Sequence, residues 1–289
     1  MRLIRTFSCA VLAAIPILAQ GPPLFPPQQL DSLVARVALY PDSLLAQVLA
    51  AATFSDQIPD AARWSDQHHY LTGDALVRDI EEDQLPWDPS VQALLPFPSV
   101  LSMMASDLNW TRDLGDAFLS QGPDVMDAVQ RERRMARDFG YLRSNGQIVV
   151  RDGPYIEIAP VNPAVIYVPY YDPLIVFARP RPGFVVSRGI TFSFGIGIGP
   201  AFRPWGWGGN RIVWGSHAVF VNNAEWHRNW VNRGSYVHPY TIRRPGPAPR
   251  IEERHPVRER SERERAADRN GARRRVEEHR QDERREERR

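Results

Sequence analysis

The stretch from Pro154 to Pro173, PYIEIAPVNPAVIYVPYYDP, places tyrosines and a carboxylate close together in a strand-like sequence. The candidate binding residues in it are Tyr167, Tyr170, Tyr171 and Asp172. Aromatic rings can stack on a ligand while a carboxylate accepts its hydrogen bonds, so a ligand site is one interpretation. The other is a structural clasp, because buried tyrosines are common packing residues and these prolines fall at strand ends. The alternating pattern favours the structural clasp, and Asp172 is the residue that still supports a ligand site.

A basic, tryptophan-bearing surface is a second candidate site. The residues that we single out there are Trp214, Trp226, Trp230, Arg228 and Arg233. Aromatic rings stack on sugars or bases, while guanidinium groups bind phosphates and carboxylates. We expect an envelope glycan, an anionic lipid surface or another envelope protein as partner, and no nucleic acid, because the N-terminal sequence predicts export. The alternative is that these tryptophans cover the helical part of the chain.

Carboxylates could support a third chemistry, hydrolysis, if several of them share one cleft. The candidates are Asp88, Asp107, Asp113, Asp116, Glu157 and Asp172. The sequence contains no Gly-x-Ser-x-Gly, Ser-x-x-Lys or His-Glu-x-x-His motif. Most acidic residues lie at first turns or exposed faces of expected helices, where capping explains them. We therefore predict a non-enzymatic protein, with an envelope hydrolase that uses helical-domain carboxylates as the alternative.

Metal and cofactor chemistry finds little support in the residue types. His217, His227 and His238 lie on three consecutive strand-like pieces and could converge, but we expect surface or packing roles for them. The only cysteine, Cys9, lies in the expected signal, so no thiolate or disulfide is expected in the mature chain. All 36 basic residues are arginine, which excludes Schiff-base and Walker lysines. We expect no metal and no cofactor.

The N-terminus predicts export. Residues 1–19 combine two arginines, a short apolar run and a small residue at a plausible cleavage point, as in a secretory signal peptide. The apolar run is shorter than the roughly 20 residues that span a bilayer, and we expect no transmembrane helix in the mature chain. Residues 20–29 form a proline-rich spacer. The protein is therefore expected in the periplasm, in association with the outer envelope, or outside the cell.

The body of the chain predicts an α+β fold. A helical domain over residues 30–145 is punctuated by prolines that mark helix starts. A small antiparallel β-meander follows over residues 146–173, opened by an Asn145-Gly146 turn of type I′. Residues 174–249 form a Gly/Trp/Arg-rich segment of strands or irregular structure, and residues 250–289 a disordered Arg/Glu tail.

One stretch of the Gly/Trp/Arg-rich segment alternates strictly. In GITFSFGIGIGPAF, the residues Ile190, Phe192, Phe194, Ile196 and Ile198 share one face, and the opposite face is nearly bare because of its glycines. This pattern predicts a strand that makes close contact with another surface.

Charge is distributed unevenly along the chain. Residues 28–145 carry a net charge of −9, whereas residues 146–250 carry +7. These two parts could dock on each other or on a neighbouring copy, which would bury the basic face. The sequence leaves both arrangements open.

Three quoted stretches resemble a known family. LVARVALYPDSLLAQVLAAATFSDQI, LPWDPSVQALLPFPSVLSMMASDLNWTRDLGDAF and IEIAPVNPAVIYVPYYDP together resemble a bacterial envelope family known as domain of unknown function 3300, over Leu30 to Pro173. The resemblance implies export, a helical domain and no assigned activity. Together with the residue patterns, it predicts an exported cell-envelope protein that acts through binding.

Overall fold

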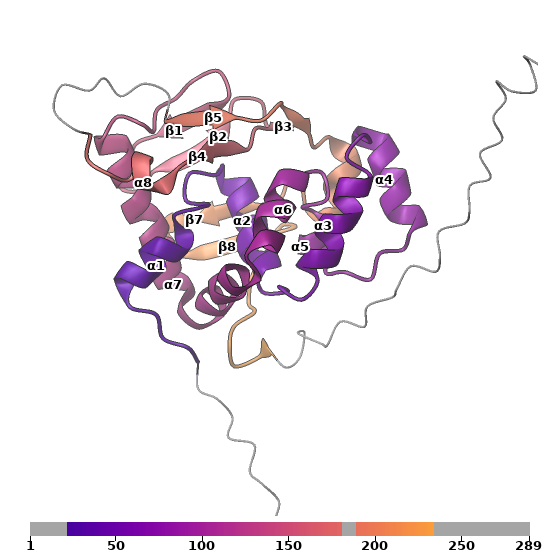
Figure 1. The fold of residues 1–289 in the computed structure, drawn as a ribbon, viewed down its shortest axis with the longest axis horizontal. Helices are drawn as coiled ribbons and strands as arrows, with labels where there is room; N and C mark the ends of the chain where they lie inside the picture. Colours follow the sequence, from indigo (N-terminus) through magenta and orange to yellow (C-terminus); the bar gives the residue numbers. More distant parts are fainter. Residues whose placement is uncertain (1–21, 181–188, 234–289) are drawn as a thin grey trace, which may run out of the picture. The chain divides into compact units, whose positions relative to one another are not determined.

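Helices fill the first part of the chain in the computed structural model, which describes residues 22–180 and 189–233 (Figure 1). They are α1 (Pro27–Val34), α2 (Asp42–Ala52), α3 (Ile58–Gln67), α4 (Gly73–Glu82), α5 (Pro89–Gln92), α6 (Pro98–Ser106) and α7 (Leu108–Asp138). Prolines lie at or beside the starts of α2, α3, α5 and α6, as predicted, because the first turn needs no N–H donor from them. Pro123 is different: α7 continues past it with a kink at Gln121.

The longest helix, α7, packs closely on α1 and α2. Gly115 permits the close approach to α2, since a Cβ atom there would overlap the carbonyl group of Ala52 at the end of that helix. Every residue of α2 from Leu44 to Ala52 is buried. This helix therefore forms the centre of the helical part.

The strands form small antiparallel sheets. β1 (Ile148–Arg151) pairs with β2 (Glu157–Pro160), β3 (Val165–Ile166) with β6 (Ile196–Gly197), β4 (Pro169–Tyr171) with β5 (Ile190–Phe192), and β7 (Arg211–Val213) with β8 (Ala218–Val221), which also pairs with β9 (Ala224–Glu225). Between them lie α8 (Pro173–Val176) and the 3₁₀ turns η1 (Pro200–Trp205) and η2 (Trp214–Ser216). The α+β class is confirmed, but β3 and β4 pair with the Gly/Trp/Arg-rich segment and do not continue a meander from β2.

The predicted type I′ turn at Asn145-Gly146 is wrong. Neither residue has a positive φ; the side chain of Asn145 instead accepts hydrogen bonds from the N–H groups of Gln147 (2.8 Å) and Ile148 (3.0 Å). The residues before Asn145 form no strand that could complete a hairpin, because the N–H groups of residues 141 and 142 fold back onto the carbonyl of residue 136 at the end of α7. Two consecutive residues with positive φ, as a type I′ turn requires, occur instead at Asn222 and Asn223 (φ 53° and 60°), between β8 and β9.

Residues 165–171 run against residues 190–197 with one extra residue on the second segment. Ile166 faces Ile196 and Pro169 faces Phe192. An advance of three residues on the first segment is therefore matched by four residues on the second. This is a β-bulge at residues 193–194, and it turns Phe194 out to solvent, where the side chain is 96% exposed. The strict alternation predicted for residues 190–198 is therefore interrupted at Phe194.

One hydrophobic core spans the helices and the Gly/Trp/Arg-rich segment. Phe202, Trp207 and Trp214 are buried in the same cluster as α2, α5 and α6. In Figure 1, β7 and β8 lie beside α2, in agreement with the contacts between these elements. A smaller cluster lies beneath the β1–β2 hairpin and contains Ile156, Ile158 and Val176.

Several predictions fall outside the described residues: the signal peptide (1–19), the tail (250–289) and His238. Within residues 22–180 and 189–233, no helix is both long enough and apolar enough to cross a bilayer.

Candidate functional site

A groove of about 610 Å³ lies between the helices and residues 193–199. One wall comes from the α3–α4 and α5–α6 connections and the starts of α4 and α6; it includes Leu71, Leu76, Leu95 and Pro98, with His68 and His69 beside them. The other wall is Tyr170, Phe194, Ile196 and a series of glycines. Ligand sites have volumes of roughly 300–1,000 Å³ and mostly apolar linings, so this groove has the size and chemistry of one.

The backbone of β6 faces this groove with one uncovered edge. In an antiparallel pair, alternate residues turn their N–H and C=O groups toward the partner strand. The N–H of Ile198 donates to Ala164 (2.9 Å), so Ile198 and Ile196 face β3 whereas Gly195 and Gly197 face away from it. No strand among the described residues pairs with that outer edge.

The glycines of this edge have different neighbours. A Cβ atom at Gly195 would lie 2.7 Å from the Val165 side chain and 3.0 Å from the ring of Tyr167, so this position requires glycine. At Gly197 and Gly199 a Cβ atom would meet nothing within 4 Å. The edge is therefore bare on the open side, and another backbone could approach it closely.

Exposed aromatic side chains lie around the groove. Phe194 is almost fully exposed and Tyr170 is 45% exposed, and both line it. Tyr70 is also exposed and lies between the lining residues His69 and Leu71. Large apolar groups gathered on a surface typically mark an interaction site.

Of the predicted tyrosine site, only Tyr170 lines the groove. The hydroxyl of Tyr171 accepts the N–H of Leu39 (3.3 Å), and burial raises its pKa well above the ordinary value. Asp172 accepts the N–H of Leu174 (2.9 Å) and so caps α8. Tyr167 packs beside Gly195. The four residues thus have separate environments, three of which are accounted for by packing or capping.

Two tryptophans of the basic surface, Trp214 and Trp226, contact the helices through their rings, and Trp230 does so through its backbone. The indole N–H of Trp214 donates to Asp42 (3.0 Å), and its ring lies under the guanidinium of Arg133. Trp226 stacks on Phe118 with ring centroids 6.1 Å apart. The backbone N–H of Trp230 donates to the carbonyl of residue 119 on α7 (2.9 Å). These contacts correspond to the alternative in which tryptophans cover the helical part.

The two arginines of this surface are also engaged. Arg228 forms an ion pair with Asp88 (2.9 Å) and lies over the rings of Phe54 and Trp226. Arg233 lies over the ring of Trp230, 3.7 Å from its centroid, and donates to its carbonyl. Among the described residues, the basic part therefore contacts the acidic helical part through Arg228.

The six candidate carboxylates do not share one cleft. Asp88, Asp107 and Asp172 cap the starts of α5, α7 and α8, three separate places in the fold. The N–H of residue 110 and then Arg36 hold the pKa of Asp107 below its ordinary value. Glu157 is exposed on β2 and lies 3.6 Å from an arginine of β1.

Asp113 and Asp116 are the two candidates that interact with each other. Burial raises the pKa of Asp116, and the neighbouring charge of Asp113 raises it further. Both lie on α7, away from the groove lining. Among the described residues, this pair therefore gives the hydrolase alternative no support.

The histidines are also dispersed. His217 lies 3.0 Å from Asp127, and His227 is exposed beside Glu225. Within the described ranges, no three histidine, cysteine or acidic side chains are grouped as metal ligands.

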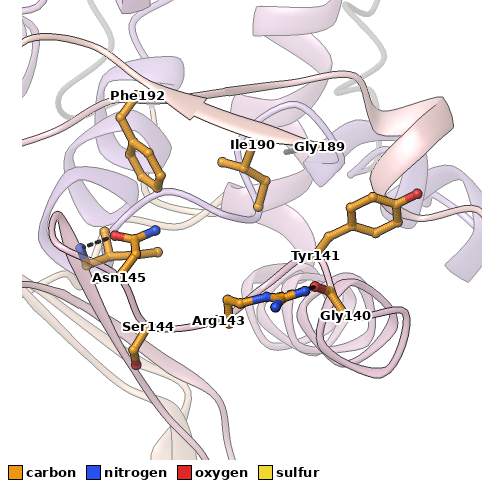
Figure 2. A pocket seen from close by; sticks show the side chains of 9 residues that line it. Gly140, Tyr141, Arg143, Ser144, Asn145, Gly189, Ile190 and Phe192 are labelled. Carbon is orange, nitrogen blue, oxygen red and sulfur yellow. Dashed lines mark hydrogen bonds between the residues drawn. The ribbon is translucent and has the colours of Figure 1, made fainter. Parts of the chain in front are cut away.

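A smaller hollow of about 280 Å³ lies at the end of α7 (Figure 2). The guanidinium of Arg143 points back to the carbonyl oxygen of Gly140, just past the end of the helix (3.1 Å from Nε), as Figure 2 shows. Gly140 has a φ of 81°, which is typical of a helix C-terminus. Gly189 in its wall adjoins residues outside the described part, so we assign no site here.

The groove was only partly visible in the sequence. The bare glycine face of residues 190–199 indicated close contact with another surface, and Tyr170 was a predicted binding residue. The opposite wall, with His68 and Leu71, carried no comparable signal, because its residues are brought to the groove only by the packing of α3, α4 and α6.

Comparisons with known proteins agree with the resemblance in the sequence. The chain is 34% identical over 246 residues to the Uncharacterized protein YacH of Escherichia coli (strain K12); the match covers 65% of this chain and 40% of that relative. No solved structure matches the chain. The sequence profile of the family described as Protein of unknown function (DUF3300) matches residues 26–243, which includes the groove and the docked tryptophans. The chain belongs to this family.

Proposed function

We propose that the chain is an exported, non-enzymatic envelope protein that binds an extended apolar segment of another envelope protein in the groove. The observation that carries this proposal is the uncovered edge of β6 at the wall of a mostly apolar groove. Export rests on the signal-peptide pattern of residues 1–19.

A peptide fits this groove better than a compact small molecule. Exposed strand edges bind extended peptides through backbone hydrogen bonds, while pockets take alternate side chains. Gly195 and Gly197 offer the backbone groups, and the apolar walls offer contacts for alternate side chains. Phe194, turned outward by the bulge, stands at the groove without a packing role in the fold.

The unpaired edge of β6 also favours a bound partner, because it is exposed beside aromatic side chains. An unpaired strand edge beside exposed aromatic side chains favours aggregation, and proteins usually protect such edges. Here the edge carries glycines and no charged side chain between residues 189 and 199. A bound strand would pair the edge and bury the apolar walls together.

The experiment is a titration of the full exported chain with a fluorescein-labelled octapeptide of alternating Val and Thr, followed by anisotropy. Gly197→Pro removes an outward N–H without removing a hydrogen bond to β3. We expect at least a tenfold weaker binding for Gly197→Pro, and near wild-type binding for the matched control Gly197→Ala, whose methyl group meets open space. Equal binding by both variants, with unchanged melting temperatures, would exclude strand addition at β6.

A further inference from the structure

A second pocket, of about 360 Å³, lies on another part of the surface. It is formed by the start of α2, the β1–β2 hairpin and β7, and it shares no lining residue with the groove. Its polar lining residues are Asp42, Ser43, Arg151, Glu157, Asn210 and Arg211.

Two donors in this lining have no hydrogen-bond partner within the described part of the chain. The side chain of Asn210 is 8% exposed, and its Nδ2 makes no hydrogen bond. Its orientation is fixed, because Oδ1 accepts the N–H of Asn222 (2.9 Å), which only an oxygen can do. The hydroxyl of Ser43 is the second such group. Buried donors without partners are rare in folded proteins, since leaving one unsatisfied is costly.

The charges of the pocket favour an anion. Asp42 is neutralised by Arg133 at 2.6 Å, and Glu157 lies 3.6 Å from Arg151. Arg211 stacks on the ring of Phe220, 3.9 Å from its centroid, and has no ion pair among the described residues. The pocket therefore combines two paired carboxylates with one cation whose charge is not balanced.

We propose that this pocket binds the carboxylate of a small organic acid. A carboxylate offers acceptors only, which matches the amide of Asn210, the hydroxyl of Ser43 and the guanidinium of Arg211. Asn210 and Ser43 supply the hydrogen bonds, and Arg211 supplies the charge. The acid could come from an acidic sugar or from a peptide C-terminus, which share this group.

The test is an NMR titration of the ¹⁵N-labelled full chain with D-glucuronate and, separately, with N-acetylglycine. The readouts are the side-chain amide signal of Asn210, identified by its loss in Asn210→Asp, and the backbone amide signals of residues 210 and 211, which remain in every variant. We expect saturable shifts with a Kd of about 1 mM for the ligand of matching source, as is usual for molecules of this size. Neutral D-glucose should give no shift at the same concentrations.

Three variants examine the assigned roles. Asn210→Asp keeps the acceptor for Asn222 but replaces the donor with an oxygen and adds a charge of the same sign as the ligand, so it should weaken binding at least tenfold. Ser43→Ala should weaken it several-fold, and Arg211→Gln about tenfold, whereas Arg203→Gln outside the pocket should change nothing. No saturation with either acid up to about 10 mM, tenfold above the expected Kd, or equal binding by all three variants would overturn the proposal. Equal binding of glucose would also overturn it.

Discussion

The guanidinium of Arg133 donates to the carboxylate of Asp42 at a distance of 2.6 Å in the interior of the protein. Arg133 is 0% exposed, and it also donates to the carbonyl oxygens of residues 38, 40 and 156. The other oxygen of Asp42 accepts the indole N–H of Trp214. One arginine thus joins α7, the start of α2, the β1–β2 hairpin and the Gly/Trp/Arg-rich segment.

Arg133→Met should lower the free energy of unfolding by about 3–5 kcal/mol, because it leaves the partly buried carboxylate of Asp42 without its cation and the carbonyls of residues 38 and 40 without this donor. Urea unfolding followed by tryptophan fluorescence measures this loss. The double variant Asp42→Asn with Arg133→Met should recover part of it, since the uncompensated charge is gone. A single variant as stable as wild type would show that the network contributes little.

Glu132 should make stability depend on pH. Burial raises its pKa from 4.5 to about 7, and the nearby charge of Asp31 adds to the shift while Arg131 opposes it. A carboxyl whose folded pKa is raised stabilises the fold below its unfolded pKa, and this contribution is lost as pH rises from about 4.5 to about 7. We expect the melting temperature to fall over this range.

Glu132→Gln should remove that part of the pH dependence. At pH 8 this variant should be more stable than wild type by on the order of 1 kcal/mol, and at pH 5 the two should be alike. Glu157→Gln, an exposed control on β2, should leave the slope unchanged. A slope that persists in Glu132→Gln would assign the titration to another group.

Gly115→Ala should destabilise the protein by about 1–3 kcal/mol, because the new methyl group would push α7 away from the backbone of α2. Gly122→Ala in the same helix is the matched control, since its nearest neighbour would lie 3.9 Å away. That variant should be neutral or stabilising by up to about 1 kcal/mol. The melting temperatures of both variants measure these effects. If Gly115→Ala were as stable as Gly122→Ala, the close approach of α7 to α2 would be excluded.

Arg228→Gln should cost about 1 kcal/mol, since its ion pair with Asp88 is only partly exposed and its guanidinium covers two aromatic rings. Arg63→Gln, whose pair with Asp60 is exposed, should cost less than about 0.5 kcal/mol. The stability losses of the two variants are compared through their denaturant midpoints at low and high salt. A loss at Arg63 as large as that at Arg228 would mean that the docked position of Arg228 adds nothing.

Local patterns predicted the helices well, because proline at a helix start and apolar spacing act within a few residues. The α+β class and the starts of α2, α5 and α6 followed from such signals. The pairing of β3 with β6 did not, since it joins residues about thirty apart and depends on a bulge at residues 193–194. Arg133 likewise looked like one arginine among many, and only tertiary packing makes it the centre of a buried network.

In the candidate site, too, the features set by local sequence were predictable and those set by tertiary packing were not. Tyr170 and the glycine-rich strand could be singled out from the sequence, because aromatic and glycine patterns are local. Leu71, Leu95 and His68 could not, because three separate helices bring them to one wall. Contact between the acidic and basic parts within one chain was one of two open alternatives, and among the described residues the pair of Arg228 with Asp88 is such a contact.

Hydrogen exchange at the amides of Gly195 and Gly197 tests the central claim most directly. Both amides face away from β3, and a bound strand would give them hydrogen-bond partners. In the presence of saturating Val/Thr octapeptide, we predict that exchange at these two amides slows at least tenfold, while the amide of Ile196, already paired with β3, changes less. Saturated binding with unchanged exchange at Gly195 and Gly197 would contradict strand addition in the groove.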